Sequence, residues 1–186
     1  MRKSVIIAVA AAIGFSTPAQ AEVTSTGETW FITKDSADIA ATPRQVWLAL
    51  IKPGLWWNDA HTWSGDASNM MLTPQAGACF CEKMPGDADI PLDGSVQHAF
   101  VEQAVPDKVL RLRGGFGPLQ DNPATGVLTI MLEEIEGGTR VSWQYFVGGP
   151  MTFSIKDIAP AVDGVMTQQL HGLRDHLGAL EQEMDD

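Results

Sequence analysis

Hydrophobic residues near the C-terminus recur at steps of three and four, which is the spacing of one face of an α-helix. We predict a long amphipathic helix over 155–180, with Asp157 as its N-cap and Pro160 in its first turn, where proline is tolerated. Its predicted inner face consists of Ile158, Val162, Val165, Met166, Gln169, Leu170, Leu173, Leu177 and Leu180. Such a face must be buried, so the helix needs a partner surface.

The middle of the chain alternates β-branched or aromatic residues with polar ones between turn signals, which is typical of strands. We predict strands over 28–39, 78–83, 94–103, 108–113, 126–134 and 139–147. Residues 58–74 have no clear period and are predicted to form a long loop, a kind of segment that is often functional. Strands followed by one long helix indicate an α+β fold class.

A short helix is expected between the first two strands. Thr42 suits its N-cap, Pro43 suits its first position, and Gln45 completes a capping box. Pro53-Gly54 ends this helix, and the apolar run 55–57 predicts a second short helical turn.

The last two strands are expected to form a hairpin with Gly137-Gly138 as its two-residue turn. The predicted pairs are Leu132 with Trp143, Ile130 with Tyr145, and Leu128 with Val147. All six side chains then share one apolar, aromatic face, which the C-terminal helix is expected to cover.

The first 21 residues have the pattern of a secretory signal peptide. Arg2 and Lys3 begin it, residues 5–15 are apolar, and Ala19-Gln20-Ala21 is a cleavage site. We expect cleavage after Ala21, a single domain over 22–186, and a periplasmic or secreted protein with no stable membrane insertion after cleavage. A retained, uncleaved anchor is the alternative.

Acidic residues outnumber basic ones by 23 to 12, for a net charge of −11. Without Arg2 and Lys3, ten basic residues remain and the charge becomes −13. Such a field repels phosphate backbones and anionic lipid headgroups, so nucleic acid and membrane surfaces are not expected as partners.

Cys79 and Cys81, the only cysteines, flank Phe80 in a predicted strand. Residues i and i+2 of a strand lie about 7 Å apart, beyond comfortable disulfide reach, so we favour two small buried side chains. A strained disulfide or a metal-binding pair is the alternative. A register that places His98 opposite Cys79 makes these three residues a candidate metal set. It lacks a fourth ligand and a familiar spacing, so we predict no metal and no cofactor.

Four segments carry a family resemblance: 39–47 (IAATPRQVW), 116–120 (FGPLQ), 137–141 (GGTRV) and 159–165 (APAVDGV), the last followed by Gln169-Leu170. They are similar to segments of START-like proteins in the SRPBCC superfamily, also described as polyketide cyclase/dehydratase-like proteins. Within this superfamily they resemble an uncharacterised bacterial branch of exported proteins. The resemblance implies a helix-grip fold, with two short helices after the first strand and a curved antiparallel sheet around a long C-terminal helix.

The resemblance also implies a ligand cavity between sheet and helix. We expect a wall made of Leu128, Ile130, Leu132, Trp143, Tyr145, Met166 and Leu170. The expected function is an exported protein that holds a small hydrophobic or aromatic molecule there. The alternative is a dry, packed core, because periodicity does not separate the two.

An enzyme of the cyclase, dehydratase or hydrolase type is the alternative function. Its candidate proton-transfer residues are Asp59, His61 and Tyr145, because a histidine near a carboxylate titrates close to neutral pH and a buried tyrosine hydroxyl needs a partner. For His61, a hydrogen-bonded surface position is the other interpretation. Sequence leaves open whether the protein is an enzyme.

Two further features have two interpretations each. Arg111 and Arg113 alternate with leucines; we expect them to face solvent, and an inward direction would make an anion clamp. Trp56, Trp57 and Trp63 are either packed under the loop or exposed as a contact patch of an interaction domain.

Overall fold

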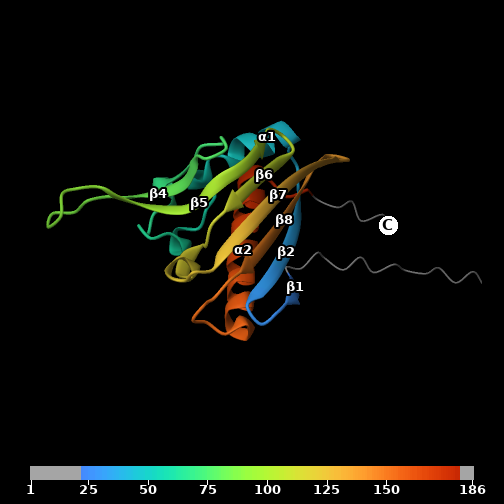
Figure 1. Ribbon diagram of the computed structural model, residues 1–186. Coiled ribbons are helices and arrows are strands. Elements are labelled where there is room, and N and C mark those ends of the chain that lie inside the picture. Colours follow the sequence, from blue (N-terminus) through green and yellow to red (C-terminus); the bar gives the residue numbers. More distant parts are fainter. Residues whose placement is uncertain (1–21, 181–186) are drawn as a thin grey trace, which may run out of the picture.

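The computed structural model describes residues 22–180 and contains an eight-stranded antiparallel sheet with one long helix across one face (Figure 1). The strands are ordered β1-β2-β8-β7-β6-β5-β4-β3. Their bounds are β1 Glu22–Thr26, β2 Trp30–Ile39, β3 Met70–Leu72, β4 Cys79–Met84, β5 Gly94–Val105, β6 Val109–Arg113, β7 Thr125–Ile135 and β8 Gly138–Gly148. The helices are α1 Pro43–Leu50 and α2 Ile155–Leu177. This is the predicted α+β helix-grip fold; the predicted signal peptide over 1–21 lies outside the described residues.

α2 follows the predicted helix closely but differs at both ends. Its N-cap is Ser154 rather than Asp157: the Ser154 hydroxyl oxygen accepts the Asp157 backbone N–H at 3.3 Å and donates to the Asp157 carboxylate at 2.6 Å. The helix ends at Leu177 because Gly178 adopts a φ of 99°, outside the helical region. Within residues 22–180, no helix is both long enough and apolar enough to cross a membrane.

The predicted capping box at the start of α1 is confirmed. The Thr42 hydroxyl accepts from the Gln45 backbone N–H at 3.4 Å, and the Gln45 side-chain oxygen accepts from the Thr42 N–H at 2.9 Å. After α1, residues Pro53–Leu55 form a 3₁₀ turn that leads into Trp56 and Trp57. Both indole rings are buried.

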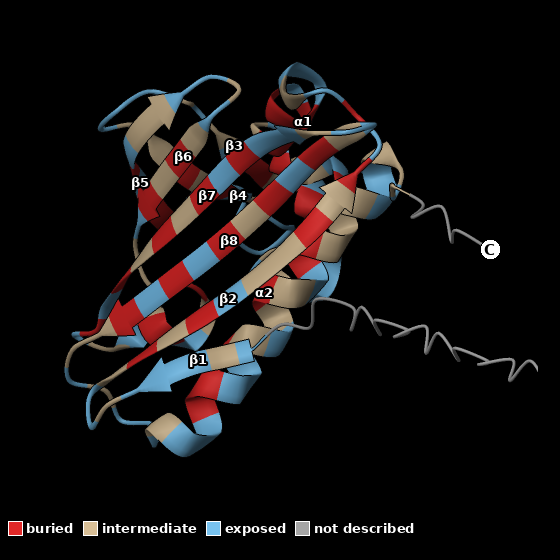
Figure 2. Cartoon of the chain, turned by 90° about the vertical axis from the view of Figure 1, so that its right-hand side faces the viewer, coloured by how far each residue is buried: buried red, intermediate tan, exposed pale blue. Residues whose placement is uncertain are grey.

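The β7–β8 hairpin forms, but its register differs from the prediction by two residues. The loop residues are Glu136 and Gly137, and Gly137 takes a φ of 78°, which favours glycine. The observed pairs are Leu132 with Val141, Ile130 with Trp143, and Leu128 with Tyr145. A two-residue shift leaves every side chain on its original face, so the predicted apolar face is retained (Figure 2).

Two other segments are more structured than predicted. The expected first strand over 28–39 is β2, and a separate edge strand, β1, precedes it. The expected loop over 58–74 contains two 3₁₀ turns, Asp59–His61 and Ala67–Asn69, followed by the short strand β3. Asn58 and Asp66 cap these turns by accepting backbone N–H groups, which explains the polar residues in this stretch.

The position of α2 leaves part of the inner sheet face for another element to cover. α2 packs mainly against β2, with further contacts to β1 and α1. The inner face of β4 to β6 lies farther from it and is covered by the segment 53–63, which carries Trp56 and Trp57. The core is therefore built from the sheet, α2 and this segment together.

Candidate functional site

A cavity of about 350 Å³ lies between the first half of α2, residues 57–63 and residues 116–121. Its volume is near the lower end of the roughly 300–1,000 Å³ typical of small-molecule pockets. The lining is apolar along α2 (Ile158, Ala161, Val162, Val165, Met166), aromatic at Trp57, Trp63 and Phe116, and polar at His61, Thr62, His98 and Asp121.

Aromatic rings form the inner wall of this cavity. The ring of Trp57 lies 5.4 Å from that of Phe80 and 6.3 Å from that of Phe116, measured between ring centroids. Trp63 also lines the cavity, but its side chain is 49 % exposed, so it borders the opening. Such walls favour a flat, apolar guest.

Glu82 and His98 form a buried pair at the cavity wall. The Glu82 carboxylate oxygen lies 3.0 Å from His98 Nε2. Burial opposes ionisation of Glu82, but hydrogen bonds from Ser64, Trp63 and His98 outweigh it and lower the Glu82 pKa. Burial also lowers the pKa of His98, against the opposing effect of Glu82. The pair is therefore a carboxylate that accepts from a neutral imidazole, whose Nδ1 is left as an acceptor 3.5 Å from Gln120 Nε2.

The Glu82 carboxylate also anchors the loop that borders the cavity. It accepts the backbone N–H of Trp63 at 3.0 Å and that of Ser64. Glu82 is fully buried, so its carboxylate has lost its hydration. The hydrogen bonds from Trp63, Ser64 and His98 compensate for that loss. The carboxylate thus links β4, β5 and the loop after residue 61.

His61 is held by a buried amide on α2. Gln169 Nε2 lies 2.8 Å from His61 Nδ1, and Gln169 Oε1 accepts the backbone N–H of Asn58 at 2.9 Å. The Trp57 indole N–H donates to the His61 carbonyl oxygen at 3.1 Å. His61 is thereby positioned against the cavity by both α2 and the neighbouring aromatic residue.

The cavity lies closer to the N-terminal half of α2 than the sequence led us to expect. Of the seven predicted wall residues, only Met166 lines it. The other six, Leu128, Ile130, Leu132, Trp143, Tyr145 and Leu170, are buried in the core, where three of them border a void of about 10 Å³. The physical reason is Trp56, whose ring lies 6.1 Å from that of Trp143 and fills the space beneath the sheet.

Of the three candidate proton-transfer residues, only His61 borders the cavity. Asp59 instead accepts the Ala67 backbone N–H at 2.7 Å. The Tyr145 hydroxyl donates to the Gly114 carbonyl oxygen at 2.8 Å and accepts the Phe116 N–H at 3.3 Å. Burial raises the pKa of Tyr145, so this hydroxyl stays protonated and holds the turn after β6 in place.

Cys79 and Cys81 are joined by a disulfide, contrary to the favoured interpretation of two separate buried thiols. Their Cα atoms are 5.4 Å apart, shorter than in a regular strand, at a point where the β4–β5 register is irregular. Phe100, and not the predicted His98, lies opposite Cys79. Within the part of the chain described, no three His, Cys, Asp or Glu side chains gather as a metal site requires.

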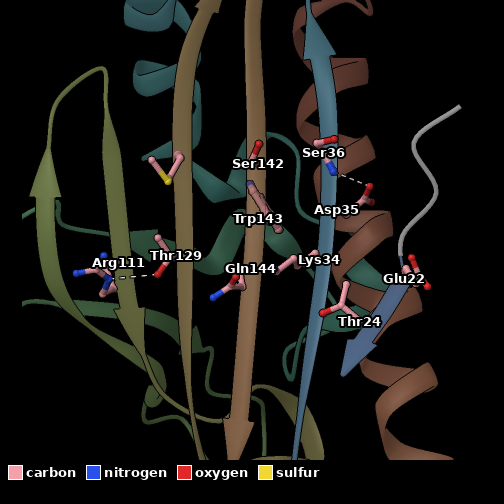
Figure 3. Close-up of a pocket in the computed structure, with 11 residues that line it drawn as sticks. Glu22, Thr24, Lys34, Asp35, Ser36, Arg111, Thr129, Ser142, Trp143 and Gln144 are labelled. Carbon is pink, nitrogen blue, oxygen red and sulfur yellow. Dashed lines mark hydrogen bonds between the residues drawn. The ribbon is translucent and has the colours of Figure 1, made fainter. Parts of the chain in front are cut away.

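A second depression, of about 580 Å³, lies on the face of the sheet that points away from α2 (Figure 3). Its lining includes Lys34, Thr129 and Gln144. Arg111 also lines it and therefore points outward, as expected from the sequence. Its guanidinium donates to the Thr129 hydroxyl at 3.2 Å and to the Gln103 side-chain oxygen at 2.9 Å. Arg113 likewise points outward and is paired with Glu102. Most of the side chains that line this depression are polar, so it fits an apolar guest less well than the cavity beside α2.

Two of the three tryptophans in this region are packed in the core and one is exposed, so the structure agrees with neither interpretation for all three. Trp56 and Trp57 are each 8 % exposed and belong to the core, whereas Trp63 is half exposed. A single exposed indole at the rim of a cavity is a smaller feature than the contact patch that an interaction domain needs.

No protein-family model matches the chain, and no curated protein matches it. Solved structures do resemble it. A protein from Rhodobacter sphaeroides is 20 % identical, with a TM-score of 0.57 over 87 % of this chain and 100 % of that one. An uncharacterised protein from Rhizobium leguminosarum is 17 % identical, with a TM-score of 0.59 over 87 % and 98 %. The Aha1 dimer from Colwellia psychrerythraea is 16 % identical, with a TM-score of 0.51 over 77 % and 93 %. These likenesses support the helix-grip fold.

Sequence reasoning missed two residues of this site, Glu82 and Gln169. Gln169 lies on the predicted apolar face of α2, and a polar residue there is a signal that a buried partner exists. Glu82 had no comparable signal, because charged residues are common at the exposed positions of strands. From the sequence, His98 was considered only as a metal ligand. Its pairing with the Glu82 carboxylate is seen only in the folded chain.

Proposed function

We propose that this chain is an exported START-like protein of the SRPBCC superfamily that binds a small apolar or aromatic molecule in the cavity beside α2. The observation that carries the proposal is an apolar, aromatic-walled cavity of about 350 Å³ with only a few polar groups. Export rests on the signal pattern over 1–21, and a disulfide is the form that cysteines take in an oxidising compartment.

The first test is native mass spectrometry of the mature protein purified gently from its own host. A small molecule present in stoichiometric amount and released on denaturation is the expected result. The mass of the chain itself would locate signal cleavage, which is expected after Ala21.

A pair of substitutions on α2 separates cavity binding from surface adsorption. Val165 lines the cavity, so Val165→Phe should fill part of it and weaken retention of the bound molecule. Asp175 is exposed near the other end of the same helix, so Asp175→Phe is the matched control and should leave retention unchanged. Equal retention by both variants would contradict the proposed location.

A second candidate function is a cyclase- or dehydratase-type enzyme on the same fold. The buried Glu82–His98 pair favours it, because a carboxylate that orients a neutral imidazole and stabilises its protonated form is a recurrent general-base arrangement. The measurement that distinguishes it from a carrier is turnover of the released molecule by fresh protein. Loss of that turnover in His98→Asn, with the molecule still bound, is the result that enzyme function requires.

A further inference from the structure

The hydrogen bonds around Gln169 determine which way its amide faces. Gln169 is fully buried, and its neighbours on α2 and the loop after Trp57 leave it two polar contacts. One partner is the Asn58 backbone N–H, which only donates. The oxygen of Gln169 must therefore face Asn58, and its NH₂ group must face His61 Nδ1.

This orientation assigns the proton of His61. Nδ1 accepts from the Gln169 amide at 2.8 Å, so in the neutral ring the hydrogen is on Nε2. Among residues 22–180, no group accepts a hydrogen bond from His61 Nε2, and His61 is one of the residues that line the cavity. His61 therefore presents an N–H donor that the protein leaves available.

Three other side-chain donors on the lining are already used within the protein, and the remaining one, the indole N–H of Trp63, belongs to a half-exposed residue at the opening. The Trp57 indole N–H donates to the His61 carbonyl at 3.1 Å, and the Thr62 hydroxyl donates to the Asp59 carbonyl at 2.7 Å. The Nε2–H of His98 is held by Glu82 at 3.0 Å. The cavity thus combines apolar walls with a positioned donor, and polar groups of this kind determine how a ligand is oriented.

The negative charge of the protein limits which acceptor group of a ligand can bind this donor. Asp121 borders the cavity, and the chain carries a formal charge of −11, so an anionic ligand would be repelled. We infer that the ligand has a flat apolar body bearing a neutral acceptor oxygen, such as a ketone or aldehyde carbonyl, which His61 Nε2–H binds. This inference rests on the proposed function, because it concerns the polar end of the same ligand.

The test compares two naphthalene probes of similar shape, 2-acetylnaphthalene and 2-isopropylnaphthalene, by calorimetry at pH 8. In the unaltered mature protein the ketone should bind roughly 3- to 10-fold tighter, the range expected for one net hydrogen bond. In His61→Phe the preference should disappear while hydrocarbon binding persists. His61→Gln, whose amide nitrogen reaches the position of Nε2, should restore it, whereas His61→Asn should not.

The possible failures are distinguishable. If neither probe binds, the proposed function fails at this site. If both bind equally to the unaltered protein, or if His61→Phe keeps the ketone preference, the donor role of His61 is overturned while apolar binding stands. Nitrogen-15 NMR of the His61 ring provides a check that needs no ligand: a protonated Nδ1 and bare Nε2 in the neutral ring would contradict the assignment.

Discussion

Replacing Glu82 with glutamine tests whether one buried carboxylate holds the cavity loop in place. The carboxylate accepts three hydrogen bonds, from the Trp63 and Ser64 N–H groups and from His98 Nε2. In Glu82→Gln an NH₂ group replaces one oxygen. This NH₂ group then faces at least one of these N–H donors, and two donors cannot form a hydrogen bond with each other. His98 can change tautomer to accept from the new amide, but a backbone N–H has no such choice.

The expected loss of stability follows from these contacts. A hydrogen bond to a charged group contributes about 1.5–3 kcal/mol, and a buried donor left without a partner costs about 1–3 kcal/mol. With one backbone donor stranded, we expect Glu82→Gln to lower the free energy of unfolding by about 2–4 kcal/mol at pH 7. Glu102→Gln on β5 is the matched control: its carboxylate pairs with Arg113 near the surface, where solvent screening leaves an ion pair little net effect on stability.

Urea denaturation, followed by tryptophan fluorescence, measures both variants. The pH dependence adds a second criterion. Because the Glu82 pKa is lowered in the folded state, its contribution is fully present above the unfolded value of about 4.3 and is lost as pH falls through the folded value. The difference in unfolding free energy between the unaltered protein and Glu82→Gln should therefore become smaller as the pH is lowered. A variant no less stable than Glu102→Gln at pH 7 would refute the anchoring role.

Three further predictions concern the core and the disulfide. Burial raises the pKa of Asp35, whose Oδ2 has no partner among the described residues, so the folded state favours the protonated form. Asp35→Asn should raise the unfolding free energy by up to about 1 kcal/mol at pH 7, and this gain should fade as pH falls toward about 4 in urea titrations; a gain independent of pH would contradict it. Trp143→Ala removes a buried indole packed on Trp56 and should cost about 3–5 kcal/mol of stability while the variant, where folded, still binds 2-isopropylnaphthalene in calorimetry. Loss of binding by a folded variant would place Trp143 in the ligand site after all. Finally, thiol titration of the unfolded, unreduced protein should detect no free thiol from Cys79 or Cys81 and two after reduction; two before reduction would exclude the bridge.

Much of the fold could be predicted because its signals are local. The capping box at Thr42 and Gln45 depends on residues three apart, and the spacing of apolar residues on α2 depends on one helix. The hairpin shows the limit of such signals. Either adjacent glycine could supply the positive φ, and both registers bury the same face, so alternation alone did not distinguish them.

The candidate site was harder to predict because it is assembled from distant segments. His61 and Gln169 are 108 residues apart, and Glu82 and His98 belong to different strands. The inner face of the β7–β8 hairpin was predicted as a cavity wall, but Trp56 packs against it. A pattern shows which side chains are buried but not whether protein or ligand covers them.

Sequence patterns identified six of the eight strands, the helices α1 and α2, the buried faces of α2 and the β7–β8 hairpin, and the net acidity, since these follow from local propensity, periodicity and composition. The three-dimensional arrangement was needed to locate the cavity, to show that Cys79 and Cys81 are bridged, and to identify the partners of Glu82, His61 and His98. The physical reason is that hydrogen bonds and packing act over a few ångströms of space, whatever the separation along the chain.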